Sequence, residues 1–174
     1  MTMVSAPERA ETAEYYHRYI DQVPAGDIRD VLERQLGEAS SMLEAISEQQ
    51  SLHRYAPGKW SIREVVAHIN DTERLFTFRA FWFARALGEP LPSFDQDIAA
   101  SHAGADDRTW RSHLDEFRAV RAATIALFRN LPAEAWTRRG VASGNPFTVR
   151  ALAYIAAGHV AHHLRLLREQ YLTP

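Results

Sequence analysis

The stretch Ser61–Leu87, SIREVVAHINDTERLFTFRAFWFARAL, decides the fold class that this sequence predicts. Ser61 and Glu64 form a capping box, in which the serine hydroxyl accepts a hydrogen bond from the amide three residues later and the glutamate carboxylate reaches back to the first amide. Apolar side chains then recur at the spacing of one helix face. Gly88 and Pro90 follow as helix breakers. We therefore predict a long amphipathic helix from Ser61 to about Leu87.

Three further helices are predicted on either side of this one. Asp27 can cap a helix over about residues 28–46, and Thr148 can cap a last helix that ends near residue 170. A third helix is expected over about residues 108–130. The chain nowhere shows the sustained alternation of β-branched residues that is typical of strands. The sequence therefore predicts an all-α fold, a four-helix bundle.

The connections between these helices indicate one domain with a long crossover. Residues 92–107, between the second and third helices, are polar and numerous enough to form a crossover rather than a tight turn. A length of 174 residues fits a single domain. We expect this domain to cover residues 1–174, with the bundle core at about residues 27–171 and an N-terminal helical extension at residues 8–20.

Composition excludes several classes of function. The chain has no cysteine, which rules out disulfides, iron–sulfur clusters, thiolate zinc sites and a cysteine nucleophile of its own. A net charge of −2 indicates no nucleic-acid partner. The most hydrophobic stretch, residues 75–87, is interrupted by Arg79 and Arg85 and is too short to span a bilayer. The charged first twenty residues do not resemble a signal peptide. We expect a cytoplasmic protein with no membrane partner.

Two histidines of the last helix lie on its apolar face. At about 100° per residue, His159 and His163 fall among the apolar positions that face the bundle core, whereas His162 falls at the edge. Two imidazoles four residues apart lie about 6 Å apart along the helix axis and can reach one metal ion. The alternative is that they form hydrogen bonds with buried carboxylates or carbonyls, because buried imidazoles without partners cost free energy.

A third ligand has to come from another helix, since two imidazoles hold a divalent ion poorly. His68 is the candidate, and periodicity permits an inward position for it without requiring one. Glu73 lies near the centre of the apolar arc of the same helix, which is unusual for a carboxylate. It could accept a hydrogen bond that orients an imidazole, act as a general base, or reflect a misjudged helix phase. The first of these interpretations is favoured.

Two motifs resemble those of the DinB/YfiT-like superfamily. They are Tyr55–Glu73, YAPGKWSIREVVAHINDTE, and His159–Leu164, HVAHHL, and the resemblance extends over about residues 27–171. It implies a four-helix bundle whose second and third helices are joined by a long crossover. It also implies one divalent ion, zinc or nickel, held by His68, His159 and His163. For His68 the resemblance supplies most of the argument.

A site of three neutral histidines leaves a coordination position open for reaction. Characterised relatives are mostly thiol-dependent, namely bacillithiol or mycothiol transferases and a mycothiol-dependent maleylpyruvate isomerase. The resemblance thus implies an enzyme that activates a low-molecular-weight thiol for S-transfer to a small-molecule substrate. One alternative is a metal-dependent hydrolase that uses metal-bound hydroxide, with Glu73 as a base. Another is a non-catalytic metal-binding or interaction module.

An aromatic cluster on the helix at residues 61–87 gives two interpretations of the oligomeric state. The family often forms homodimers by packing helices together, and this cluster could supply such a face. The cluster also spreads around most of the helix, as expected of a central helix that is buried on several sides. Its members are Phe76, Phe78, Phe81, Trp82 and Phe83.

Overall fold

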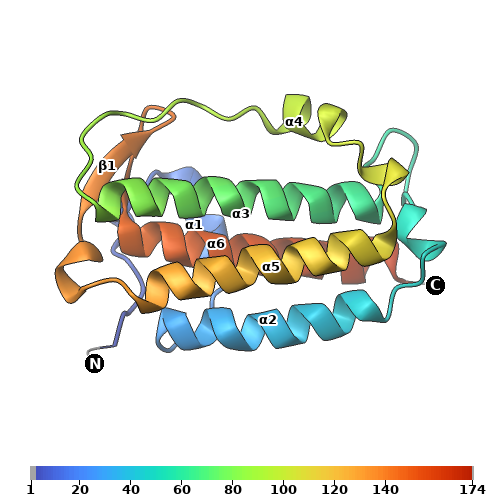
Figure 1. Cartoon of the computed structure of the whole chain (residues 1–174), viewed down its shortest axis with the longest axis horizontal. Helices are drawn as coiled ribbons and strands as arrows, with labels where there is room; N and C mark the ends of the chain where they lie inside the picture. Colours follow the sequence, from blue (N-terminus) through green and yellow to red (C-terminus); the bar gives the residue numbers. More distant parts are fainter. Residues whose placement is uncertain (1–2, 174) are drawn as a thin grey trace.

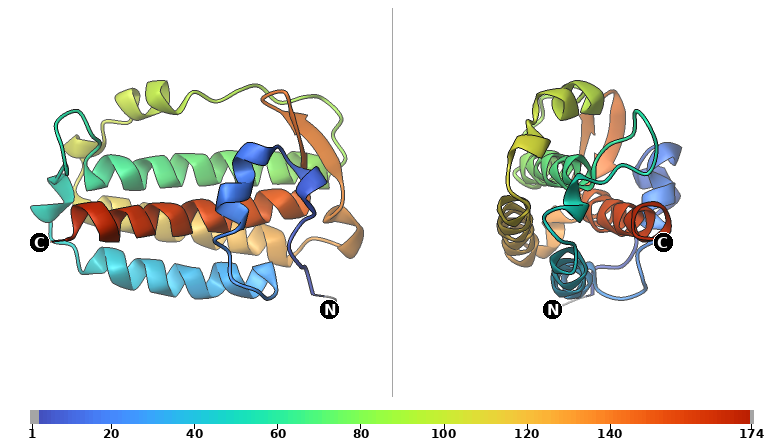
Figure 2. Two further views of the ribbon diagram at one scale, coloured as in Figure 1. Left: turned by 180° about the vertical axis from the view of Figure 1, so that it is seen from behind. Right: turned by 90° about the vertical axis from the view of Figure 1, so that its right-hand side faces the viewer.

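Four long helices form a bundle in the computed structural model of this chain, which describes residues 3–173 (Figure 1). Each begins at a side chain that accepts a hydrogen bond from a backbone amide of the first turn, as the sequence predicts for Asp27, Ser61 and Thr148. The end-on view of Figure 2 shows the bundle in cross-section. The four helices are α2 (Ile28–Glu44), α3 (Ile62–Ala84), α5 (Trp110–Arg129) and α6 (Val149–Leu166).

The predicted helical bundle is confirmed, and α3 is its central element, with α5 and α6 packed against it. The predicted capping box is also present, because Glu64 N donates to Ser61 Oγ at 3.1 Å and Ser61 N donates to the Glu64 carboxylate at 2.7 Å. Helix α3 ends at Ala84, three residues before the predicted end at Leu87. Ala86, just after the helix, adopts a positive φ of 56°. No helix among residues 3–173 has the length and apolar character needed to cross a membrane.

The prediction that the chain has no strands is wrong. Strands β1 (Arg139–Ala142) and β2 (Asn145–Thr148) form an antiparallel hairpin. Ser143 and Gly144 connect them, both with positive φ, as a two-residue turn of this kind requires. Strands of four residues are too short for alternation to stand out in the sequence. The hairpin packs closely on α3, since a Cβ at Gly140 would lie 2.0 Å from the Phe83 ring.

The connection between α3 and α5 runs along the length of the bundle, over α3 (Figure 1). It contains the short helix α4 (Gln96–His102) and a 3-10 turn at Ala105–Asp107. Asp95 caps α4 by accepting from two backbone amides, so this segment is more regular than the sequence indicates. Because the chain returns along the bundle before α5 begins, α3 and α5 run in the same direction (Figure 1).

The N-terminal segment lies across α6 (Figure 2). Its short helix α1 (His17–Ile20) follows two 3-10 turns, at Arg9–Glu11 and Glu14–Tyr16. The crossing is close, because a Cβ at Gly158 of α6 would lie 2.0 Å from the carbonyl oxygen of Tyr19. Tyr19 is therefore held against the middle of α6.

A buried carboxylate anchors the start of this N-terminal segment. Glu11 accepts hydrogen bonds from the hydroxyl of Thr148 at 2.7 Å and from Nε of Arg150 at 2.7 Å. Burial acts to raise the pKa of Glu11, but the hydrogen bonds from Arg150 and Thr148 outweigh it and lower that pKa to about 2. Glu11 is therefore ionised at neutral pH and ties the segment to the beginning of α6.

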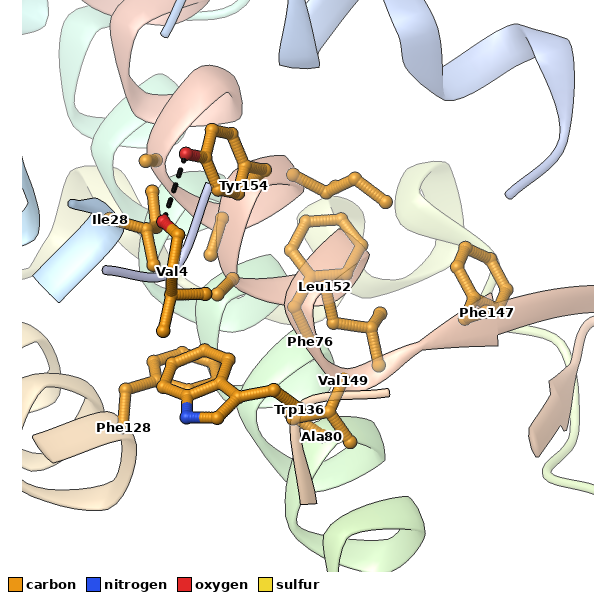
Figure 3. Close-up of a cluster of buried hydrophobic side chains, with 14 of the residues drawn as sticks. Val4, Ile28, Phe76, Ala80, Phe128, Trp136, Phe147, Val149, Leu152 and Tyr154 are labelled. Atoms are coloured by element: carbon orange, nitrogen blue, oxygen red, sulfur yellow. Dashed lines mark hydrogen bonds between the residues drawn. The ribbon is translucent and has the colours of Figure 1, made fainter. Parts of the chain in front are cut away.

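The apolar core falls into two clusters with a polar layer between them. The first cluster gathers around Phe76 of α3 and Ala157 of α6, and the second around Ile69 and Val160 of the same helices. Buried polar side chains occupy the intervening turns of α3 and α6. Figure 3 shows the first cluster, where the hydroxyl of Tyr154 donates to the Val4 carbonyl at 3.3 Å.

The aromatic cluster of α3 is divided between core and surface. Phe76 and Phe83 are buried in the first apolar cluster, whereas Phe78 and Phe81 are exposed. Burial of the helix on several sides thus explains part of the cluster. A homodimer formed through the exposed pair stays a prediction.

Candidate metal centre

Three buried histidines from two helices converge in the core. His68 comes from α3, and His159 and His163 come from successive turns of α6. The Nε2 atom of His159 lies 3.2 Å from Nε2 of His68 and 3.1 Å from Nε2 of His163. One nitrogen from each ring can be chosen so that all three lie within 4.8 Å of one another. The predicted trio is therefore assembled at a single point.

This arrangement fits a metal ion. Tetrahedral coordination with metal–nitrogen bonds of about 2.0–2.1 Å places ligand nitrogens about 3.3 Å apart. The two Nε2–Nε2 distances of 3.2 and 3.1 Å are close to that value. Hydrogen bonds among the three rings could satisfy only some of their nitrogen atoms, because each neutral imidazole has a single N–H to donate. The chemistry of three imidazole donors suits zinc, nickel, copper or iron(II).

Burial keeps the three imidazoles neutral. It lowers the pKa of His68 to about 4 and that of His163 to about 3. Burial lowers the pKa of His159 as well, and the neighbouring His163 and His68 lower it further. The ring of Trp60 lies 5.0 Å from that of His68 and helps to cover it. At neutral pH every ring therefore has a lone pair for a metal ion, and no proton has to be removed first.

Thr72 holds the ring of His159, a contact that the sequence reasoning missed. Its hydroxyl donates to the backbone carbonyl of His68 at 2.7 Å and lies 3.3 Å from Nδ1 of His159. Because the hydroxyl proton is used on the carbonyl, its oxygen can accept from Nδ1–H of His159. That hydrogen bond leaves Nε2 as the acceptor atom that faces the other histidines. The available signal was that Thr72 follows His68 by four residues, on the same face of the helix.

Glu73 is buried, as its place in the apolar arc predicts, and its partner is an arginine of another helix. Arg121 of α5 donates to the Glu73 carboxylate at 2.8 Å, and both side chains are buried. Arg121 also donates to the side chain of Gln35, which in turn donates to the Ala157 carbonyl. The second carboxylate oxygen of Glu73 has no hydrogen-bond partner among the described residues. No imidazole of the described chain is hydrogen-bonded to Glu73, and its catalytic role stays a prediction.

His162 lies beside the cluster without joining it. It is half-buried, and its ring packs edge-on against Tyr19 and His163, at centroid distances of 5.5 and 5.1 Å. The metal-ligating group in the described chain contains only the three histidines named above. This agrees with the helix-face argument that favours His159 and His163 over His162.

A cavity of about 270 Å³ opens beside the cluster and reaches His159. Its walls come from the N-terminal segment, α3, the α3–α5 connection and the β-hairpin. They are largely aromatic, and none of the described lining residues is a carboxylate. The lining consists of Tyr15, Tyr16, Tyr19, Thr72, Leu75, Phe76, Arg79, Phe94, Gln96, Ser143 and His159.

Fold and site together define a helical bundle with three buried histidines that can hold a metal ion beside an open cavity. The chain belongs to the DinB superfamily, whose family model matches residues 31–167. This confirms the family resemblance drawn from the two sequence motifs.

A solved structure supports the same fold. The chain is similar to YfiT from Bacillus subtilis, described as "a probable metal-dependent hydrolase with an unusual four-helix bundle topology". The TM-score is 0.72 at 18% sequence identity, and the match covers 94% of this chain and 90% of that one. No curated protein matches this chain at a significant level.

Proposed function

We propose that this protein is an enzyme that binds one divalent ion, zinc or nickel, through His68, His159 and His163. We propose further that it activates a low-molecular-weight thiol for transfer to an electrophilic small molecule. The observation that carries the proposal is the convergence of three neutral, buried imidazoles, with Nε2 atoms 3.1 and 3.2 Å apart, beside a cavity. A structural site would be closed, whereas three protein ligands leave a position for a reactant.

The residues around the site have separate tasks in this proposal. A bound divalent ion would lower the pKa of a coordinated thiol or water, so that an attacking anion forms at neutral pH. Thr72 keeps the His159 ring in the tautomer whose Nε2 faces the cluster. Trp60 and Phe76 cover the rings of His68 and His159 and limit the access of water. The cavity at His159 gives a substrate its way in.

The lining of the cavity favours thiol transfer over hydrolysis. Hydrolysis is aided by a general base that takes a proton from the attacking water. The described lining contains no aspartate or glutamate, and the nearby Glu73 is engaged with Arg121. A thiol needs less help, since coordination deprotonates it outright. The absence of cysteine from the sequence is compatible with a thiol that arrives as a cosubstrate.

Hydrolysis is the second candidate, and the likeness to YfiT is the observation that favours it. In that case the same three histidines would hold the ion, and Thr72 would keep its positioning task. The long connection between α3 and α5 would be the crossover that the family resemblance implies in either case.

Metal content tests the proposal first. Untagged protein purified without chelators would be analysed by inductively coupled plasma mass spectrometry, together with His163→Ala and the matched control His162→Ala. We expect about one equivalent of metal in the wild type and in His162→Ala, and loss of metal in His163→Ala. No metal in the wild type after incubation with zinc or nickel would refute both enzymatic candidates.

Activity then separates the candidates. Loss of monochlorobimane that requires both the bound metal and an added thiol, such as bacillithiol or mycothiol, supports thiol transfer. Ester or amide turnover without thiol supports hydrolysis instead. Metal binding with neither activity would leave the chain as a non-catalytic metal-binding or interaction module.

A further inference from the structure

We propose that the cavity beside the histidines binds the carboxylate of an organic anion, with the Arg79 guanidinium as its counterion. The inference rests on the proposed function in one respect, because it identifies the bound anion as the substrate of the metal site. Binding itself does not require the metal, so the two ideas can fail separately.

Arg79 differs from the other buried arginines of the described chain. Arg63 is paired with the carboxylate of Glu48, and Arg121 with that of Glu73. Arg79 is only 2% exposed, yet no carboxylate among residues 3–173 forms an ion pair with it. Within the described chain, two of the three buried guanidinium groups are thus paired with acids, and the one that lines the cavity is not.

The partners of Arg79 are neutral groups. Its Nη2 donates to the Pro92 carbonyl at 3.2 Å and to the hydroxyl of Ser143 at 2.8 Å. Its Nε lacks a hydrogen-bond partner in the described part of the chain. A guanidinium stays protonated in proteins, so the charge cannot be removed by titration. A buried cation without an anion is costly, and a bound carboxylate would offset that cost through charge-assisted hydrogen bonds.

The position of Arg79 links this charge to the metal centre. Arg79 follows Thr72 by seven residues, which places it two turns further along the same face of α3, about 10 Å along the axis. The guanidinium itself is held at the Pro92 carbonyl and the Ser143 hydroxyl, on the side where the α3–α5 connection and the β-hairpin meet α3. Thr72, Arg79 and His159 line the same cavity. An anion held by Arg79 could therefore place its other end near His159.

The remaining walls indicate what the body of the ligand is like. The lining combines aromatic rings, with Phe76 and Phe94 among them, and polar groups such as Gln96. Tyrosines of the N-terminal segment also line the cavity. These surfaces suit a compact aromatic body that bears a carboxylate, and a single arginine in the described lining disfavours a polyanion.

Isothermal titration with phenylacetate and its neutral analogue phenylacetamide tests the proposal on the purified protein. We expect phenylacetate to bind the wild type at least about 30-fold more tightly than phenylacetamide, because only the carboxylate compensates the buried charge. Arg79→Met should weaken phenylacetate binding at least about 30-fold. Arg79→Lys should retain part of that affinity. Arg85→Met removes an exposed arginine of the same region and should stay within about twofold of the wild type.

A second set of samples separates this proposal from the proposed function. Metal content is measured in each sample, and His163→Ala provides protein without a complete metal site. Phenylacetate binding that persists in His163→Ala and is lost in Arg79→Met supports the role of Arg79, even if the wild type holds no metal. Equal affinity for acid and amide in the wild type would overturn the proposal. So would unchanged phenylacetate binding in a folded Arg79→Met protein, because the carboxylate would then be bound elsewhere.

Discussion

Replacement of Glu73 by glutamine should destabilise the protein strongly through the arginine that it leaves behind. Glu73 and Arg121 are respectively 2% and 0% exposed in their side chains, and their atoms are 2.8 Å apart. Glutamine has nearly the same size as glutamate, so the change removes the negative charge without opening a cavity. Arg121 would keep its neutral contact with Gln35 and would lose its only ion pair in the described chain.

The magnitude follows from the burial of both partners. Removal of one member of a buried ion pair costs about 3–5 kcal/mol, because the other charge stays in the protein interior without compensation. For a chain of this length that loss corresponds to a fall in Tm of roughly 6–20 °C. The exposed pair of Glu33 with Arg129 gives the matched control, since Glu33→Gln should cost no more than about 1 kcal/mol.

Urea unfolding followed by circular dichroism would measure both variants, with the free energy of unfolding obtained by linear extrapolation. The double variant Glu73→Leu/Arg121→Met should be more stable than Glu73→Gln, because it removes both charges from the interior. If Glu73→Gln loses no more stability than Glu33→Gln, the argument from the buried pair is refuted. Metal content in Glu73→Gln should stay at about one equivalent if the glutamate acts through Arg121 and not on the histidines.

Three further predictions follow from particular contacts. Thr72→Val should weaken metal affinity about 10–100-fold in competition with a chelating dye, whereas Thr77→Val, away from the histidines, should not. Gly158→Ala should lower the free energy of unfolding by about 1–3 kcal/mol, because its methyl group would collide with the Tyr19 backbone, and an unchanged urea midpoint would contradict that packing. Metal-free protein should lose roughly 2 kcal/mol between about pH 7 and about pH 5 through His68 alone, since the pKa of His68 is about 4 when folded and about 6.5 when unfolded. The unfolded chain binds the additional proton in that interval, so stability falls as the pH falls, and a flat profile would refute the burial argument.

Contacts and periodicity within a few residues of sequence determined where the helices begin and which histidines of the last helix face the core. Helix starts can be predicted from the sequence because a cap joins residues only a few positions apart, as at Asp27, at Thr148 and at Ser61 with Glu64. The inward direction of His159 and His163 follows from the fixed angle per residue of a single helix. For the same reason the sequence indicated that Glu73 lies on the apolar face.

Only the tertiary structure decided which side chains from different helices meet. Periodicity left the direction of His68 open, and packing of α3 against α6 brought its Nε2 within 3.2 Å of His159. The partner of Glu73 is Arg121, 48 residues away, and no local pattern identifies such a pair. The hairpin was missed because two four-residue strands carry little periodic signal. Arg79 is buried without a carboxylate partner among residues 3–173 because segments far apart in the chain close around it, and no local sequence pattern identifies which segments these are.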